Sequence, residues 1–362
     1  MALAAADGAA MSPLKGVRLY NLRAMARTNR FPSWALAGLL ALTPACTFGQ
    51  GFSALMSGPR LSVSELAPLA REGDVEAQLK LATMYYNGER ASQDFEKAAE
   101  WYRKAAEQGS AEAQFSLGVM STRGEGMPAD PEQAARFYLL AAEQGHAEAQ
   151  FNLALAHLEG RGITLDLGQA NRWMRLAAEQ GMPEAQFSFA SFALEGIGML
   201  ADEPLGAQYM LRAANAGVLE AEAQLGGLYQ LGRGVEKDTA QAVRWFRIAA
   251  EHGHADAQTS LGLAHIRGEG VEQDFTAAAG WLLQAADAGV PTAQNNLALL
   301  YLRGDGVEKN RVEAHKWWTL AATFGDEIAA QRRDSLARGL SADELAASQA
   351  AVRAWMQERL RR

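Results

Sequence analysis

The 362-residue sequence lacks several features that identify common classes of protein. Its single cysteine, Cys46, excludes both an intrachain disulfide and a cysteine metal cluster. Ten prolines and 21% charged residues accompany 49% hydrophobic residues, which is a composition typical of folded chains and not of disordered ones. The sequence therefore predicts a folded protein that is long enough to bury a large core.

Positive charge is also scarce. The formal net charge is −8, and no dense run of lysine or arginine occurs before the last few residues. Such a chain has no cationic field that would attract phosphate backbones or anionic membrane surfaces. We therefore expect no nucleic-acid partner and no basic helix that binds a membrane surface.

Charge of either sign is absent between Arg30 and Arg60. This stretch contains a short apolar core, Trp34–Leu42, and arginines precede it, as in a secretory signal peptide. Thr43 and Ala45 occupy the −3 and −1 positions of a cleavage site before Cys46. The apolar run is shorter than the roughly 18 residues of a membrane-spanning helix. We therefore predict that this segment does not span the membrane. We predict export to the periplasm or secretion from the cell, and a place in the bacterial cell envelope.

Other interpretations of this segment stay open. Translation from Met25 would give a leader of more ordinary length than translation from Met1. Acylation of Cys46 would make the protein a lipoprotein with a lipid anchor, although Thr43 stands where leucine is usual in such signals. If the leader does not function, the segment is a disordered tail and the protein is cytoplasmic.

Repetition dominates the rest of the sequence. Seven glycines lie 36 residues apart, each follows a pair of alanines, and an aromatic residue stands four positions before the first alanine. The phrase AAEQG, for example, ends at Gly109, Gly145 and Gly181. The aromatic residues are Trp101, Phe137, Trp173, Tyr209, Trp245, Trp281 and Trp317. Such a period is typical of stacked structural repeats.

Each repeat predicts two helices. Asp94, Asp130 and their counterparts are short acceptors that suit a helix N-cap, and the glycine that closes each repeat suits the left-handed residue after a helix. The preceding half carries an alanine, a leucine and a small residue at helical spacing, as at Ala113, Leu117 and Gly118. It ends in a Gly-x-Gly turn such as Gly124–Gly126.

The stretch Ala111–Gly145, AEAQFSLGVMSTRGEGMPADPEQAARFYLLAAEQG, resembles the Sel-one-like repeat (SLR) family, which is related to the tetratricopeptide repeats. The resemblance implies an all-α fold, an α-solenoid of seven repeats wound as a right-handed superhelix, whose concave face usually holds other proteins. It implies no chemistry. Local departures are Arg90 in place of a turn glycine, Glu222 in place of glutamine, and the apolar turn Gly196–Leu200.

We expect three regions: a leader and linker over residues 1–60, the SLR solenoid over 61–325, and C-terminal capping helices over 326–362. Ser64–Gly73 is a half-repeat, in which Glu65 takes the aromatic position. At the other end one helix runs to about Ala337, and Ser341–Glu344 forms a capping box. The helix that follows is expected to turn five residues inward: Leu345, Val352, Trp355, Met356 and Leu360.

Catalytic and cofactor sites find little support. The Gly-x-Gly motifs recur every 36 residues without a preceding strand, so they are turns and not nucleotide-binding loops. Carboxylates recur with the repeat, and no pair of them is singled out. His157 and His265 share a column with tyrosines and should pack inside, His146 and His254 should lie in loops, and His315 should lie at the surface. His252 and His254 have nothing nearby to complete a metal site, so we predict no catalytic, cofactor or metal-binding residues.

Specificity is expected where the repeats differ. The positions three and ten residues after the conserved alanine of each first helix lie about 20° apart and are mostly polar. The candidate partner-binding residues at these positions are Arg123, Asn152, Glu159, Ser188, Glu195, Arg267, Asn296 and Arg303. An ordinary solvated face is the alternative. The ladder Phe115, Phe151 and Phe187 should pack between adjacent repeats.

We therefore predict a non-catalytic scaffold or regulator of the bacterial cell envelope, which binds a protein or peptide, or alternatively a glycan, on this variable face. One alternative is an envelope enzyme that acts on peptidoglycan or a β-lactam, as has been proposed for some SLR proteins, although no residue supports it. Another is a cytoplasmic adaptor.

Overall fold

The computed structural model describes residues 61–361, and within them it contains helices and no strand. The predicted leader, its cleavage site and Cys46 lie outside the described residues. The helices are α4 (Val63–Arg71), α5 (Val75–Asn87), α6 (Phe95–Glu107), α7 (Ala111–Arg123), α8 (Pro131–Glu143), α9 (Ala147–Glu159), α10 (Leu167–Glu179), α11 (Pro183–Glu195), α12 (Glu203–Asn215), α13 (Leu219–Leu231), α14 (Thr239–Glu251), α15 (Ala255–Arg267), α16 (Phe275–Asp287), α17 (Pro291–Arg303), α18 (Arg311–Thr323), α19 (Glu327–Ala337) and α20 (Ala342–Arg361).

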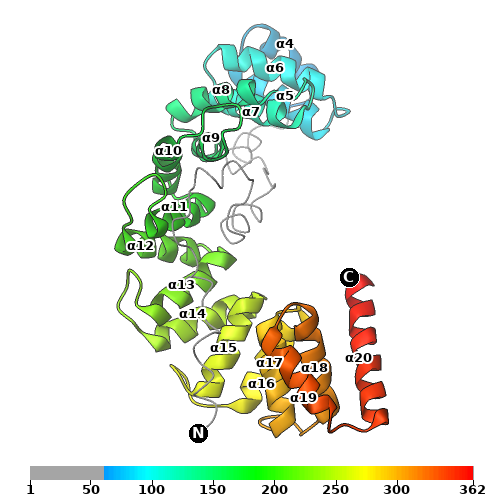
Figure 1. Cartoon of the computed structure of the whole chain (residues 1–362). Coiled ribbons are helices and arrows are strands. Elements are labelled where there is room, and N and C mark those ends of the chain that lie inside the picture. Colours follow the sequence, from blue (N-terminus) through cyan, green and yellow to red (C-terminus); the bar gives the residue numbers. More distant parts are fainter. Residues whose placement is uncertain (1–60, 362) are drawn as a thin grey trace. The chain divides into compact units, whose positions relative to one another are not determined.

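These helices form two compact units, residues 61–216 and residues 217–361. From α4 to α12 and from α13 to α19, each helix packs against the next one along the chain, as Figure 1 shows, whereas α20 packs on α18. The odd-numbered helix is the first helix of a repeat, and the even-numbered helix is the second. The chain is therefore an all-α solenoid of stacked helix pairs, as predicted.

The predicted helix boundaries are confirmed. The carboxylates of Asp94 and Asp130 accept backbone N–H bonds at the starts of α6 and α8, and Asn310 does the same for α18. The first helices end at a left-handed glycine, such as Gly124 with φ 73°. Each second helix of a repeat is also followed by a left-handed glycine, such as Gly109 with φ 89°. A side chain is disfavoured in this conformation, which explains why glycine returns every 36 residues.

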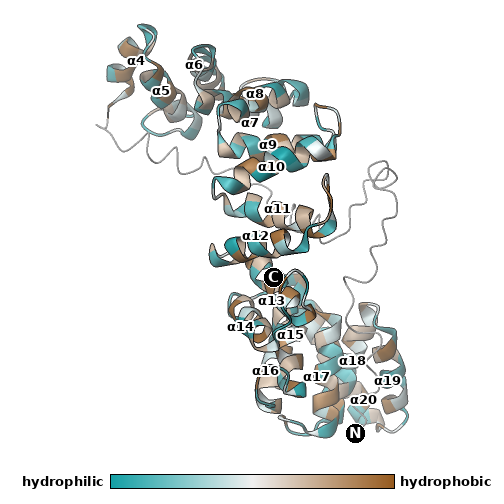
Figure 2. Ribbon diagram, turned by 90° about the vertical axis from the view of Figure 1, so that its left-hand side faces the viewer, coloured by the Kyte–Doolittle hydropathy of each residue, from teal (hydrophilic) through white to brown (hydrophobic). Residues whose placement is uncertain are grey.

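The core consists of small residues and the large side chains that fit against them. The first alanine of each pair, such as Ala105 or Ala141, has no exposed surface. In most repeats the column next to the predicted aromatic column is the more deeply buried: Tyr102 is 0% exposed, whereas Trp101 is only partly buried. A Cβ atom at Gly118 would lie 2.6 Å from the ring of Tyr138, so this small residue makes room for the second column. Figure 2 shows the resulting mixture of hydrophobic and hydrophilic residues along most helices.

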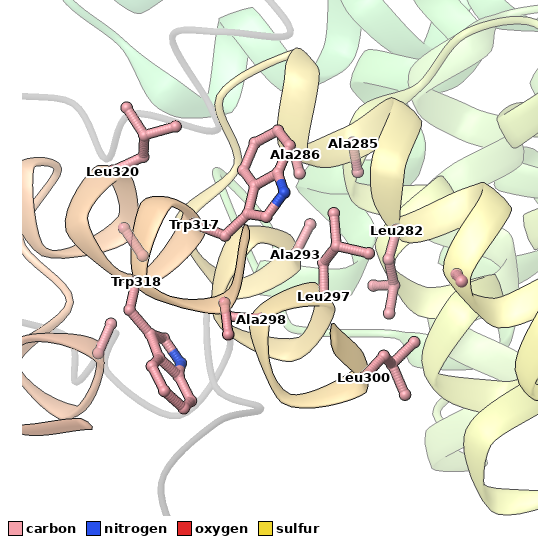
Figure 3. Close-up of a cluster of buried hydrophobic side chains, with 14 of the residues drawn as sticks. Leu282, Ala285, Ala286, Ala293, Leu297, Ala298, Leu300, Trp317, Trp318 and Leu320 are labelled. Carbon is pink, nitrogen blue, oxygen red and sulfur yellow. The ribbon is translucent and has the colours of Figure 1, made fainter. Parts of the chain in front are cut away.

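One cluster, drawn in Figure 3, illustrates this packing in residues 217–361. Leu282 of α16, Leu297 of α17 and the two tryptophans of α18, Trp317 and Trp318, meet around alanines. All four large side chains are at most 2% exposed. The repeat core that was predicted from the Ala-Ala pairs and the aromatic residues is therefore confirmed at this end of the chain.

The terminal helices have the predicted boundaries, but one side chain of α20 that was predicted to point inward does not. Helix α19 ends at Ala337, and the capping box forms through Ser341 N to Glu344 Oε2 at 2.7 Å and Glu344 N to Ser341 Oγ at 3.2 Å. Helix α20 packs on α18, with Val352, Trp355 and Met356 partly buried. The prediction for Leu360 is wrong because this side chain is 88% exposed in the last turn of the helix.

Candidate partner-binding surface

The candidate positions ten residues after the conserved alanine lie at the same place in each repeat. Arg123, Glu159 and Glu195 are the last residues of α7, α9 and α11, directly before the glycine that ends each helix. Arg267 and Arg303 end α15 and α17 in the other unit. Each unit therefore presents a row of charged residues beside its Gly-x-Gly turns. The sign of the charge changes from Arg123 to Glu159 in residues 61–216, whereas Arg267 and Arg303 are both positive in residues 217–361.

The candidate positions three residues after the alanine lie deeper. Ser188 is 4% exposed, and its hydroxyl donates to the carbonyl oxygen of Glu184 at 2.9 Å. Asn296 is half-buried and donates in the same way to Thr292 at 2.8 Å, and Asn152 is also half-buried. The alternative of an ordinary solvated face does not hold for Ser188, which is buried and bonds within its own helix, and its role in binding a partner stays a prediction.

Charged residues in the row pair across the glycine that follows them. Glu159 lies 2.7 Å from Arg161, and their side chains are 39% and 63% exposed. Arg123 lies 3.9 Å from Glu125, and Arg267 lies 3.8 Å from Glu269. Each of these three repeats carries a local pair of opposite charges, so the field of the row is weaker than its residues alone suggest.

Arg123 also connects two repeats. Its guanidinium Nη1 donates to the hydroxyl oxygen of Tyr86 at 3.1 Å, and that hydroxyl donates to Glu125 Oε2 at 2.7 Å. Burial, together with the hydrogen bond to the Glu125 carboxylate, raises the pKa of Tyr86 to about 12. Arg123 is therefore held in place, and a partner that contacts it meets an oriented guanidinium.

Two departures from the repeat pattern lie in the turns. A Cβ atom at Gly126 would lie 2.1 Å from the carbonyl oxygen of Phe95, at the start of the preceding second helix. Arg90 takes this place in the first repeat, with φ 59°, and its Nη1 donates to Leu61 O at 3.4 Å. The apolar turn of another repeat exposes Leu200 to 90%, at a position that carries Glu236, Glu272 and Glu308 elsewhere.

The glutamine of the AAEQG phrase has a structural role that we did not predict. Gln144 Nε2 donates to Gln114 Oε1 at 2.7 Å, and Gln114 Nε2 donates to Ala106 O at 3.3 Å. Gln180 and Gln150 repeat this link at 2.8 Å. The spacing of 30 residues between paired glutamines was visible in the sequence and could have indicated it.

In one repeat a carboxylate and an imidazole replace the two amides. Glu222 is 2% exposed, and its Oε2 lies 2.9 Å from Nδ1 of His252. His252 therefore belongs to the link between helices. No group of three histidine, cysteine, aspartate or glutamate side chains in residues 61–361 is arranged to hold a metal ion.

The other histidines divide between confirmed predictions and corrections. His157 and His265 pack inside, as predicted, and each is 8% exposed. His146 and His254 are not simple loop residues, because their rings accept the N–H bonds of Ala149 at 3.3 Å and Ala257 at 3.2 Å as N-caps.

The surface prediction for His315 is wrong. His315 is 6% exposed, and its Nδ1 lies 2.8 Å from the hydroxyl of Ser348 on α20. The sequence could not show that α20 covers this side of α18.

The predicted ladder of phenylalanines packs inside, as expected. Phe115, Phe151 and Phe187 are 5% to 7% exposed. The ring of Phe115 stacks on the N-cap ring of His146, with the ring centroids 4.6 Å apart. The ring of Phe115 on α7 therefore contacts the start of α9 in the next repeat.

Comparison with known proteins agrees with this geometry. The Sel1 repeat model matches seven consecutive segments: residues 75–110, 111–146, 147–182, 183–218, 219–254, 255–290 and 291–326. No curated protein matches the chain.

Two solved structures are similar along most of the chain. The crystal structure of c5321, a protective antigen present in uropathogenic Escherichia coli strains that displays an SLR fold, is 31% identical with a TM-score of 0.72; the match covers 82% of this chain and 63% of that one. A Sel1 repeat protein from Oxalobacter formigenes is 31% identical with a TM-score of 0.59, covering 89% of this chain and 90% of that one.

Sel1 repeats are a non-catalytic kind of scaffold that generally serves interactions between proteins. None of the helices in residues 61–361 combines the length and the apolar character that crossing a membrane requires. The seven matched segments account for most of the chain, and their boundaries coincide with the helix pairs of the structure. This chain therefore belongs to the Sel1 repeat family.

Proposed function

We propose that this protein is a non-catalytic scaffold of the bacterial cell envelope, which binds a protein partner through the charged residues at the ends of its first helices. The observation that carries the proposal is the contrast between a repeated framework and this one row. The place before the turn glycine carries an arginine in three repeats, at Arg123, Arg267 and Arg303, but a glutamate in two others, at Glu159 and Glu195, so the repeat does not fix its charge.

The local ion pairs support this use of the row. Exposed pairs such as Glu159 and Arg161 contribute only about 0–1 kcal/mol to stability, because water screens both groups. The fold therefore does not depend on the pair of Glu159 and Arg161, and a partner's charged groups can replace one member of it at little cost. Such contacts mainly set the rate of encounter and the register of the complex.

A charge swap tests this surface. The double variant Glu159→Arg with Arg161→Glu keeps a pair but reverses its direction. The matched control is Arg175→Glu with Glu179→Arg, because that pair also lies at 2.7 Å and is 60% and 42% exposed, but on a second helix. The partner would first be identified by photo-crosslinking from position 159 in the producing organism.

We expect the swap at 159 and 161 to weaken binding of the crosslinked partner by about tenfold, mainly through slower association at low salt. The control should bind as the wild type does, and both variants should keep the wild-type melting temperature. Equal binding by both variants would contradict the proposed surface.

The place in the envelope rests on the leader, which lies outside the described residues. Mass spectrometry of the protein from the producing organism should find a mature N-terminus between about residues 44 and 52. Diacylglycerol on Cys46 would identify a lipoprotein. A full-length cytoplasmic species alone would contradict export.

A further inference from the structure

Arg303, at the end of α17, differs from the arginine at the same place in the preceding repeat. Arg267 lies 3.8 Å from Glu269, whereas Asp305 takes the place of that glutamate in the next turn. The aspartate side chain is one methylene shorter, and Arg303 makes no ion pair or hydrogen bond with any residue that the structure describes. Its exposed guanidinium is therefore available to a partner.

A second arginine lies near Arg303 on the following first helix. Arg332 of α19 stands three residues after Ala329, so it continues the variable column that Asn296 occupies on α17. Burial lowers the pKa of Arg332, Asp326 partly offsets this effect, and the positive charge of Arg303 lowers the pKa further. Because salt screens charges that are far apart, such a repulsion indicates that the two guanidinium groups lie close together. Neither of them has an ion pair within residues 61–361.

The guanidinium of Arg332 is held in place but is not enclosed. Its Nη1 donates to Asn295 Oδ1 at 2.9 Å, and the same oxygen accepts from Nε1 of Trp318, also at 2.9 Å. The other two nitrogens of Arg332 and the amide nitrogen of Asn295 have no hydrogen bond to a described residue, and none of them is sealed from solvent. All of these groups are donors. This part of the surface therefore offers oriented N–H groups that an acceptor in solvent can reach.

We propose that Arg303 and Arg332 together bind the carboxylate of an acidic side chain that a protein partner presents. The proposal rests on the proposed function for the nature of the ligand, and it names what the row would bind in residues 217–361. A carboxylate accepts two parallel hydrogen bonds from one guanidinium, and a second guanidinium nearby adds attraction. A singly charged group suits the site better than a phosphate dianion, because Asp326 already supplies negative charge near Arg332.

The first experiment uses the full chain and follows Trp318 by NMR. Its indole N–H shares Asn295 Oδ1 with Arg332, so a ligand on Arg332 should shift its signal. The tryptophans would be isotope-labelled, and Trp318→Phe would assign the signal. N-acetyl-glutamate-methylamide would be titrated at low and constant ionic strength, beside the uncharged N-acetyl-glutamine-methylamide and inorganic phosphate.

We expect a saturable shift of the Trp318 signal with the glutamate probe and none with the glutamine probe. The Kd of the glutamate probe should be on the order of 10 mM, as for a small ligand held by one charged group. Equal shifts with both probes, or no saturable shift with the glutamate probe, would overturn the proposal. Tighter binding of phosphate than of the glutamate probe would overturn the assignment to a carboxylate.

Two variants locate the binding. Arg303→Gln breaks no contact between described residues and should weaken the glutamate probe by about fivefold, because it removes one of the two positive charges. Arg247→Gln removes the same charge from an exposed position of α14 and should have no effect. Arg332→Gln should weaken the probe by at least about tenfold, because it removes the oriented fork of donors, and here the probe would be followed by its own signals. Unchanged binding in Arg303→Gln, or an equal loss in Arg247→Gln, would contradict the assignment.

The result is separable from the proposed function. If the glutamate probe fails to bind while the partner is still captured through position 159, only the carboxylate site is wrong. If the probe binds at Arg303 and Arg332 but no protein partner depends on Glu159 and Arg161, the carboxylate site stands and the proposed partner surface in residues 61–216 is wrong.

Discussion

The interior repeats and the C-terminal end of this protein are held together in different ways. In the interior one contact recurs, as in the glutamine links Gln114 to Gln144 and Gln150 to Gln180, both within 2.8 Å. At the C-terminal end the contacts occur once each. Asn295 Oδ1 accepts from Trp318 and Arg332, both at 2.9 Å, and His315 meets Ser348.

The difference has a physical consequence. In a stack each repeat contacts only its neighbours, so a recurring contact distributes stability over the array. Beyond the last matched repeat lie α19 and α20, and α20 covers α18 through contacts that no other described repeat contains. We therefore expect a destabilising change in the interior to unfold the repeats together. A destabilising change at the C-terminal end should detach only helix α20.

The largest effect should come from the interior core. Trp173 is 7% exposed, and Trp173→Ala should lower the free energy of unfolding by roughly 3–5 kcal/mol through the cavity it creates. Arg136→Ala, an exposed change on α8, is the control and should cost far less. Chemical denaturation followed by circular dichroism measures both. An unchanged midpoint for Trp173→Ala would show that the repeat core is wrongly assigned.

A smaller effect is expected from the recurring glutamine link. Gln150 is 4% exposed, donates to Ala142 O at 3.1 Å and accepts from Gln180 at 2.8 Å. Gln150→Leu should cost roughly 1–3 kcal/mol, because it removes both hydrogen bonds of a buried amide, although Ala142 O keeps the bond from Gly145 N. Gln208→Leu makes the same change at an exposed position and should be nearly neutral. If both variants unfold at the same denaturant concentration, the link does not stabilise the stack.

The smallest effect should appear at the C-terminal end on acidification. Burial lowers the pKa of His315, with a further contribution from Arg333 that Asp334 partly offsets. The folded state therefore disfavours the protonated ring. The stability from this group is fully present above its ordinary pKa of about 6.5 and is lost as the pH falls through the lower folded value.

Hydrogen exchange of residues 342–361 measures this prediction. Exchange of α20 should be a few-fold faster, relative to the intrinsic rate, at about pH 5 than at about pH 7.5, while exchange of α10 changes less. In His315→Gln the pH-dependent part should disappear. A variant that keeps the wild-type pH dependence would assign the effect to another group.

The recurring features of this fold could be predicted from the sequence, because each position has seven copies. The caps at Asp94 and Asp130 and the glycines at Gly109 and Gly124 follow from backbone chemistry alone, and the structure confirms them. The predicted aromatic column was less accurate. Side-chain spacing did not show that Tyr102, one residue further on, is the more deeply buried.

Features that occur once could not be predicted. The burial of His315 depends on where α20 lies, and no repeat offers a second example. The ion pair of Glu159 and Arg161 was readable as opposite charges two residues apart, but its contact depends on the left-handed turn between them. The binding residues themselves stay predictions. Packing does not fix which residue stands at a position that varies between repeats, so the fold gives no test of their role.

Arg90 sets a limit on how this array can grow. In the later turns, the equivalent glycine lies against the first carbonyl of the second helix before it, as Gly126 does against Phe95. The half-repeat helix α4 begins only at Val63, four residues later than the register of a full second helix. A duplication that placed a complete repeat in front of α5 would therefore bring a carbonyl against the Arg90 Cβ atom. New copies can enter among the interior repeats without this clash, so the array can lengthen from within more readily than at this end.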